Sequence, residues 1–175
     1  MRNSDVDASL YWLGRMLQGG ADPRFVVRRM LRMASEDIGM ADPKALEQVA
    51  AAAHAVEHMG MPECELALAQ AAVYLALAQK SNAIYKAYGA VKREVAERPG
   101  LAIPMAIRNA PTSLMKDAGY GEGYRYAHDE AGGVSDLQCL PDELGNATFY
   151  RPTNRGWEIR IRARLKEIAE AKRSR

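Results

Sequence analysis

The sequence predicts an all-α protein: a compact multi-helix bundle with an irregular Gly/Tyr-rich segment before a basic C-terminal helix. Three observations support this fold class. Apolar residues recur at three- and four-residue spacings over most of the chain, Asp-Pro pairs and glycines stand at the ends of these stretches, and abundant alanines allow helices to approach closely. The 175 residues are 48% hydrophobic and 26% charged, which is typical of one globular domain with its own core, so residues 1–175 are expected to form a single helical domain.

The first two helices are expected on either side of Gly19-Gly20. Asp7 is expected to cap a helix over residues 8–18, and Asp22 to cap the next, with Pro23 at the first helical position where its missing N–H costs nothing. The outer face of this second helix carries a stripe of basic residues, which makes it amphipathic: Arg24, Arg28 and Arg32.

Residues 33–46, MASEDIGMADPKAL, are interpreted as a helix junction. Gly39 lets the chain leave one helix and Asp42 starts the next, while Arg32 and Glu36 are four residues apart and able to pair. The alternative is an acidic catalytic pair of Glu36 and Asp37. That chemistry needs a pocket that no sequence feature supplies, so their role beyond helix termination stays open.

The next helical stretch, residues 66–78, is apolar on almost every face. A helix of this kind is buried, either centrally or between subunits, and Leu68 and Leu75 are therefore candidate oligomer-interface residues. A further helix follows from Ser81 or Asn82 and closes at Pro99-Gly100. Residues 101–152 are punctuated by Gly and Pro but carry apolar and tyrosine side chains, which predicts short helices and ordered turns before the last helix.

Several features indicate a cytosolic protein. The sequence has no apolar run long enough to span a membrane, and the charged residues 1–7 lack the apolar stretch of a secretory signal. Cys64 and Cys139 are too few for a disulfide framework and are expected to be reduced thiols. The basic character lies in the tail, since residues 151–175 hold nine Lys/Arg against three Asp/Glu.

Two motifs invite a chemical interpretation. His54, Glu57 and His58 match the H-x-x-E-H pattern of inverted zinc peptidases, but no third ligand stands out, and a solvated helix face is the simpler reading. Residues 119–126, GYGEGYRY, lack the Lys-Ser/Thr of a phosphate loop. Aromatic and basic residues in and beside this stretch suit either packing at a subunit contact or stacking on exposed bases: Tyr120, Tyr124, Tyr126, Arg125 and His128.

Five ordered blocks carry a resemblance to a known family. They are SDVDASLYWLGRML, ASEDIGMADPKAL, LAQAAVYLALAQKSNAIYKA, RNAPTSLMKDAGYGEGYRYAHD and FYRP. In this order they resemble the C-terminal region of the replication-associated recombination protein A family, clamp-loader-like AAA+ ATPases related to the Werner-helicase-interacting ATPase. The resemblance covers Ser4 to about Leu165. Gly14 and Gln79 depart from it, standing where alanine and proline are expected.

The resemblance implies a homotetramerisation and partner-docking domain without catalytic, cofactor or metal residues of its own. Full-length members bind ATP and Mg²⁺, act as DNA-dependent ATPases in replication-fork maintenance, recombination and DNA repair, and associate with DNA and single-stranded-DNA-binding protein. A cytoplasmic, nucleoid-associated location follows. This chain contains no GxxxxGK[ST] motif. The alternative is a single-stranded-DNA-binding module that uses basic side chains: Arg24, Arg28, Arg32, Arg125, Arg160, Arg162 and Arg164.

Overall fold

A computed structural model describes residues 1–145 and 147–174 and confirms the all-α fold class, because the described residues form helices, turns and irregular segments and no strand. The chain divides into two compact units. Unit 1 combines Met1–Gly89 with Tyr150–Arg162, and unit 2 combines Ala90–Phe149 with Ala163–Arg175. Two long helices, α5 (Ala83–Glu97) and α7 (Glu158–Arg173), each begin in unit 1 and end in unit 2.

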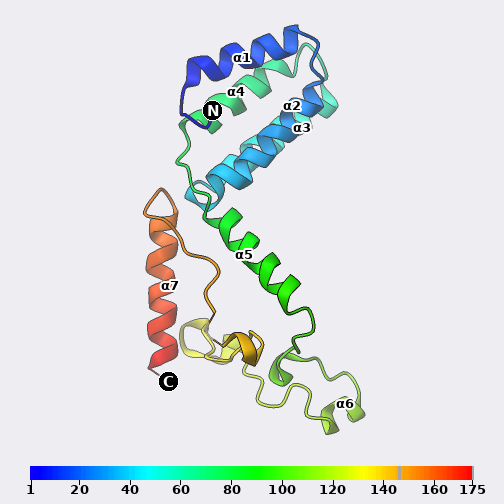
Figure 1. Ribbon diagram of the computed structural model, residues 1–175, viewed down its shortest axis with the longest axis vertical. Helices are drawn as coiled ribbons and strands as arrows, with labels where there is room; N and C mark the ends of the chain where they lie inside the picture. The colour runs from blue at the N-terminus through cyan, green and yellow to red at the C-terminus, as the bar shows by residue number, and fades with distance from the viewer. Residues whose placement is uncertain (146, 175) are drawn as a thin grey trace. The chain divides into compact units, whose positions relative to one another are not determined.

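Unit 1 is built on four helices that surround one core: α1 (Val6–Gln18), α2 (Pro23–Met33), α3 (Lys44–His58) and α4 (Glu65–Leu77) (Figure 1). Helix α4 packs against α1 and α3, and α2 packs against α3. Alanines at the contact faces, such as Ala45, Ala52 and Ala71, are buried and permit this close approach. The largest fully buried apolar side chains are Met30, Ile38, Leu68, Leu75, Val49 and Cys64.

The caps of the first two helices are only partly as predicted. Asp5, rather than Asp7, caps α1: its backbone is extended and its carboxylate accepts a hydrogen bond from the Ala8 amide at 2.9 Å. Asp7 lies in the first helical turn, where its charge favours the helix dipole without capping. The Asp22 cap is confirmed, since its side chain accepts from the Arg24 amide at 2.8 Å and Pro23 begins α2.

The junction after α2 is confirmed, although its geometry was not predicted. A π-helical turn spans Ala34–Ile38, and a 3-10 turn follows over Gly39–Ala41. Gly39 has φ +52°, a left-handed conformation that glycine adopts without strain. Arg32 and Glu36 form the predicted pair. The hydrogen bond from Arg32 lowers the pKa of Glu36, although burial opposes the shift.

Helix α4 is buried on only one side within this chain, so the predicted burial is met here by part of its surface. Leu68 and Leu75 are completely buried, whereas Leu66 and Leu77 remain 81% and 66% exposed. The structure therefore places Leu68 and Leu75 in the core of the chain and not on a surface that another subunit reaches. An apolar composition all round the helix did not distinguish the face covered by α1 and α3 from the face left open.

Residues 101–152 contain the short helices and ordered turns that the sequence predicts. They include α6 (Ser113–Asp117), capped by the Thr112 hydroxyl, which accepts from the Met115 amide at 3.3 Å. Four 3-10 turns accompany it: Met105–Ile107, Ala127–Asp129, Ala131–Gly133 and Asp142–Leu144. Asn146 of this segment and Arg175 of the basic tail lie outside the described residues.

Candidate functional site

The buried carboxylate of Glu158 organises the end of unit 1. It is completely buried at the start of α7 and accepts four hydrogen bonds. Oε2 accepts from the Thr153 amide at 2.8 Å, from the Thr153 hydroxyl at 2.6 Å and from the Ser81 hydroxyl at 2.8 Å, while Oε1 accepts from the Tyr150 hydroxyl at 2.9 Å. We call Tyr150–Glu158 the anchor segment, because the bond from Ser81 ties it to the residues just before α5.

Hydrogen bonds decide the charge of this buried group. Burial opposes ionisation of Glu158, but the bonds from Thr153, Ser81 and Tyr150 outweigh it and lower the pKa of the carboxyl below its ordinary value. Burial, together with the hydrogen bond to Glu158, raises the pKa of Tyr150, which therefore stays a protonated donor. Glu158 is thus ionised and hydrogen-bonded through both carboxylate oxygens, so its role is structural and it is not a proton-transfer group.

A close backbone contact completes the anchor segment. The Trp157 amide donates to the Ala41 carbonyl at 2.7 Å. Gly156 has φ +50°, and a Cβ atom at this position would lie 2.1 Å from the Ala41 carbonyl oxygen. Only glycine fits here. The sequence analysis did not identify the Glu158 site. Its one local signal is that Glu158 follows Gly-Trp at the start of an otherwise basic helix.

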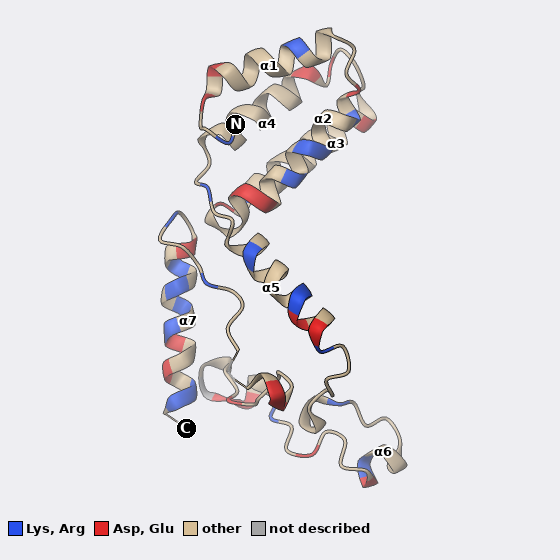
Figure 2. Ribbon diagram, viewed as in Figure 1, with Lys and Arg blue, Asp and Glu red and all other residues tan. Residues whose placement is uncertain are grey.

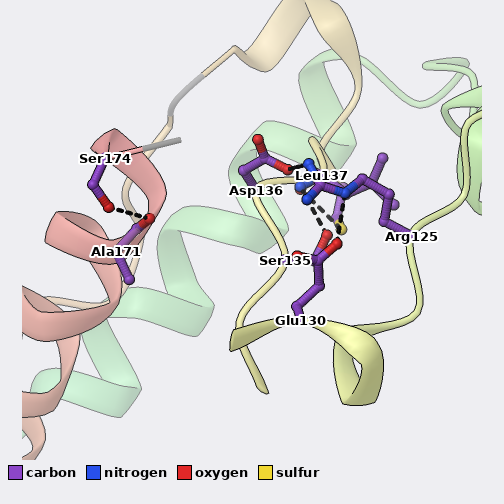
Figure 3. Close-up of polar contacts among 8 residues, drawn as sticks. Arg125, Glu130, Ser135, Asp136, Leu137, Ala171 and Ser174 are labelled. Atoms are coloured by element: carbon purple, nitrogen blue, oxygen red, sulfur yellow. Dashed lines mark hydrogen bonds and ion pairs between the residues drawn. The ribbon is translucent and has the colours of Figure 1, made fainter. Parts of the chain in front are cut away.

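The Gly/Tyr-rich part of unit 2 is held by Arg125. Its guanidinium donates from Nε to Glu130 at 2.6 Å and from Nη1 to Asp136 at 2.7 Å (Figure 3). These two carboxylates raise the pKa of Arg125, the hydrogen bond to Glu130 being the larger cause. An open cavity of about 1000 Å³ in unit 2 brings Arg125 together with Tyr120 and Tyr124. The Arg108 guanidinium lies over the Tyr120 ring, 5.1 Å from its centroid.

The two exposed tyrosines fit a contact surface. Tyr124 and Tyr126 are 56% and 53% exposed, and the Tyr126 ring lies 4.9 Å from the His128 ring. Tyr120 is half-buried. These three tyrosines remain candidate interface residues.

Most of the arginines proposed for nucleic acid already have partners within the chain. Arg32, Arg125 and Arg164 pair with carboxylates. Arg160 lies 4.7 Å from the Trp157 ring centroid, and Arg162 donates to the Pro152 carbonyl at 3.2 Å. Among the residues that the structure describes, the side chains of Arg24 and Arg28 contact no such partner, and both are exposed on α2. Basic residues recur along α7, although acidic residues interrupt them (Figure 2).

The open face of α4 is an apolar surface that suits the predicted oligomerisation. Leu66, Gln70, Val73 and Leu77 follow the i, i+4, i+7, i+11 spacing of one helical face, and we call them the outward stripe. The two leucines are strongly exposed and Val73 is half-buried. No charged side chain lies on the stripe, so it presents apolar area to whatever covers it.

The structure adds little to the zinc interpretation. His54 and His58 lie side by side on α3 with ring centroids 4.0 Å apart, and both are exposed. Within residues 1–145 and 147–174, no group of three or more His, Cys, Asp or Glu side chains is placed to hold a metal ion. In the same part of the chain, no helix is long and apolar enough to cross a membrane.

Comparison with known proteins identifies the family. The family model described as "MgsA AAA+ ATPase C terminal" matches residues 3–169. Replication-associated recombination protein A of Coxiella burnetii is 54% identical over 166 residues, which cover 94% of this chain and 38% of that protein. The Escherichia coli protein of the same name is 47% identical over 171 residues, covering 97% of this chain and 38% of that protein.

A eukaryotic relative matches as well. ATPase WRNIP1 of Dictyostelium discoideum is 46% identical over 152 residues, covering 86% of this chain and 17% of that protein. The chain thus spans less than two fifths of the length of these relatives. The match over nearly all of its residues confirms the resemblance seen in the sequence blocks, and the chain belongs to the family of MgsA AAA+ ATPase C-terminal regions.

Proposed function

We propose that this chain is the homotetramerisation and partner-docking domain of a DNA-dependent AAA+ ATPase that acts at replication forks and in recombination and repair. The outward stripe of α4 is the observation that supports homotetramerisation, because its two leucines are strongly exposed. The occupant is a second copy of this chain. Because the stripe has no charge, two copies related by a two-fold axis bring apolar surface against apolar surface without burying an unpaired ion.

The number four rests on the family resemblance, whereas the stripe supplies the physical reason to associate. A stable contact needs about 1,000 Å² or more of buried surface, which is more than one helical face offers. The exposed tyrosines of unit 2, Tyr124 and Tyr126, are rigid amphipathic side chains of the type enriched at interfaces and supply a second contact. Two different self-complementary contacts per chain generate a closed tetramer.

Analytical ultracentrifugation of the purified chain at micromolar concentration tests this proposal. We expect a mass near four times the chain mass of 19.3 kDa. Leu66→Glu or Leu77→Glu places a charge on the outward stripe and lowers the mass. Val95→Glu is the control, since Val95 is an exposed apolar residue, 59% exposed, that belongs to α5 and not to α4. A wild-type mass of one chain contradicts the proposal, as does a stripe variant that assembles like the control.

The ATPase activity of the proposed full-length protein is assigned to residues outside this region. The chain carries no phosphate-cradling GxxxxGK[ST] motif, and the matched part is only 17% of the relative named ATPase WRNIP1. We propose that ATP and Mg²⁺ bind there, and that this domain raises the effective concentration of ATPase modules on DNA and on single-stranded-DNA-binding protein. ATP turnover by the purified chain above a mock-purified control refutes this assignment.

A second candidate function is direct binding of single-stranded DNA. It is favoured by Arg24 and Arg28, which are exposed one turn apart on α2 and whose side chains form no hydrogen bond or ion pair with the described residues. If they contact phosphates, affinity for an oligothymidylate falls steeply with salt, and Arg28→Ala reduces the salt slope by about one unit. Arg32→Ala is the control, because Arg32 is already paired with Glu36.

A further inference from the structure

A small basic cavity in unit 1 has no part in the proposed assembly. Its volume is about 380 Å³, and four segments far apart in the sequence line it: the chain start, the π-helical turn after α2, the α4–α5 connection with the first turn of α5, and the anchor segment. Four cations reach it, namely Arg2, Lys80, Lys86 and Arg155, against one carboxylate, Asp37. The remaining lining residues are Ser81, Asn82, Thr153 and Asn154.

The lining charges are only partly satisfied within the chain. Arg2 donates from Nε to Asp37 at 2.9 Å, which occupies the only carboxylate among the lining residues. Lys80 donates from Nζ to the carbonyls of Ala76 and Ala78 at 3.0 and 2.6 Å, so its ammonium is fixed in place. Burial lowers the pKa of Lys80, and Asp37 opposes this shift. The cavity therefore keeps an excess of positive charge.

The unused donors lie on the side chains of α5 and the anchor segment. Arg155 donates from Nη1 to the Lys80 carbonyl at 3.1 Å, and its other N–H groups have no partner in the described part of the chain. The side chains of Asn82, Lys86 and Asn154 likewise form no hydrogen bond or ion pair with any described residue. The hydroxyls of Ser81 and Thr153 already donate to Glu158, although both residues line the cavity. A ligand with several acceptor atoms is thus able to satisfy donors from both sides of the cavity.

We propose that this cavity binds a phosphate group, carried either by a free nucleotide or by a nucleic-acid strand. The donors converge from separate segments, which suits a tetrahedral phosphate with acceptor oxygens in several directions better than a planar carboxylate. Arg155 presents a guanidinium fork and Lys86 a compact ammonium, the two side chains most used for phosphate. The volume is at the lower end of the range for small-ligand pockets and admits a phosphate with its sugar.

The cavity exists only because the anchor segment is in place. Arg155 and Asn154 stand between Thr153 and Gly156, whose bonds and close contact fix the segment to Glu158 and Ala41. The phosphate site therefore depends on residues that the proposed assembly does not use, and it is separable from the outward stripe by mutation.

Isothermal titration calorimetry of the whole chain with three probes tests the proposal: inorganic phosphate, dTMP, and an oligothymidylate without a terminal phosphate. We expect saturable binding of at least one probe, and a loss of about tenfold or more in affinity for Lys86→Ala and for Arg155→Gln. Binding of inorganic phosphate supports the phosphate site for either source. Binding of dTMP in preference to the oligothymidylate assigns the site to a nucleotide, whereas the reverse preference assigns it to a strand.

Controls separate a built site from general charge. Lys44→Ala removes one exposed cation from α3 and is expected to leave the affinity unchanged. Lys86→Arg keeps the charge at the cavity and is expected to retain most of the binding. The proposal is overturned if no probe binds, or if Lys44→Ala weakens binding as much as Lys86→Ala. Ultracentrifugation of the same variants measures the mass of the assembly independently. Failure of the phosphate proposal is therefore distinguishable from failure of the assembly proposal.

Discussion

Replacing Gly156 by alanine should detach the anchor segment from the rest of unit 1. The substitution has two separate costs. The left-handed backbone, φ +50°, costs a residue with a Cβ atom about 1–2 kcal/mol. The new Cβ atom would also stand 2.1 Å from the Ala41 carbonyl oxygen and 3.3 Å from Gln79 Cβ, and the carbonyl belongs to backbone, which cannot rotate away.

Relieving this overlap requires the two backbones to separate by about 1 Å, because real Cβ contacts essentially never fall below 3.0 Å. That separation breaks the 2.7 Å hydrogen bond from the Trp157 amide to the Ala41 carbonyl, which costs about 1 kcal/mol or more. We therefore expect Gly156→Ala to lower the free energy of unfolding of unit 1 by about 2–4 kcal/mol.

Gly20→Ala is the matched control. Gly20 also has a positive φ, +82°, but no atom lies within 4 Å of the position that its Cβ would take. It should therefore show the backbone cost of about 1–2 kcal/mol without the steric one. Urea unfolding followed by far-UV circular dichroism measures both variants. If Gly156→Ala loses no more stability than Gly20→Ala, the close contact with Ala41 does not hold the anchor segment, and the reasoning is refuted.

Two further predictions concern charged groups. Glu158→Gln should lower the free energy of unfolding by about 2 kcal/mol at pH 7, since the variant weakens hydrogen bonds to a buried charge. Because the folded-state pKa of Glu158 lies below the unfolded value of about 4.3, its stabilisation is complete above that pH and is lost as pH falls through the folded pKa, so the difference from wild type should shrink in urea titrations at pH 3. Arg125→Ala should speed chymotryptic cleavage at Tyr124 and Tyr126, because the variant releases Glu130 and Asp136; Lys116→Ala, at an exposed lysine of α6, should not.

Local signals predicted the parts of the fold that depend on neighbouring residues. The Asp22-Pro23 start of α2, the Arg32–Glu36 pair and the Gly39 exit each follow from residues within four positions. The sequence could not decide between Asp5 and Asp7 as the cap of α1, because aspartate is an acceptable cap at either position. The extended backbone of Asp5 decides it. The π-helical turn Ala34–Ile38 adds a residue to the helix without any compositional mark.

The sites that sequence reasoning missed depend on contacts across the chain. Glu158 meets Ser81 across 77 positions, and Arg155 meets Lys80 across 75, so no periodicity relates them. The same limit explains why the sequence did not reveal the internal partners of the candidate arginines. Counting basic residues identified Arg125 as a candidate for nucleic acid, but its two carboxylate partners lie 5 and 11 residues away in an irregular segment, where no helical rule brings them together.

The interleaved order of the two units has a consequence for synthesis on the ribosome. Unit 1 is interrupted after Gly89 and is completed only when Tyr150–Arg162 emerges, with Ala90–Phe149 made in between. At 5–20 residues per second, these roughly sixty residues take about 3 to 12 s. During this interval the nascent four-helix core lacks its last partner: the Ala41 carbonyl and the Ser81 hydroxyl face water, and α5 has no anchor at its start. A pause in translation before Tyr150–Arg162 has emerged from the ribosome would prolong the life of this incomplete core.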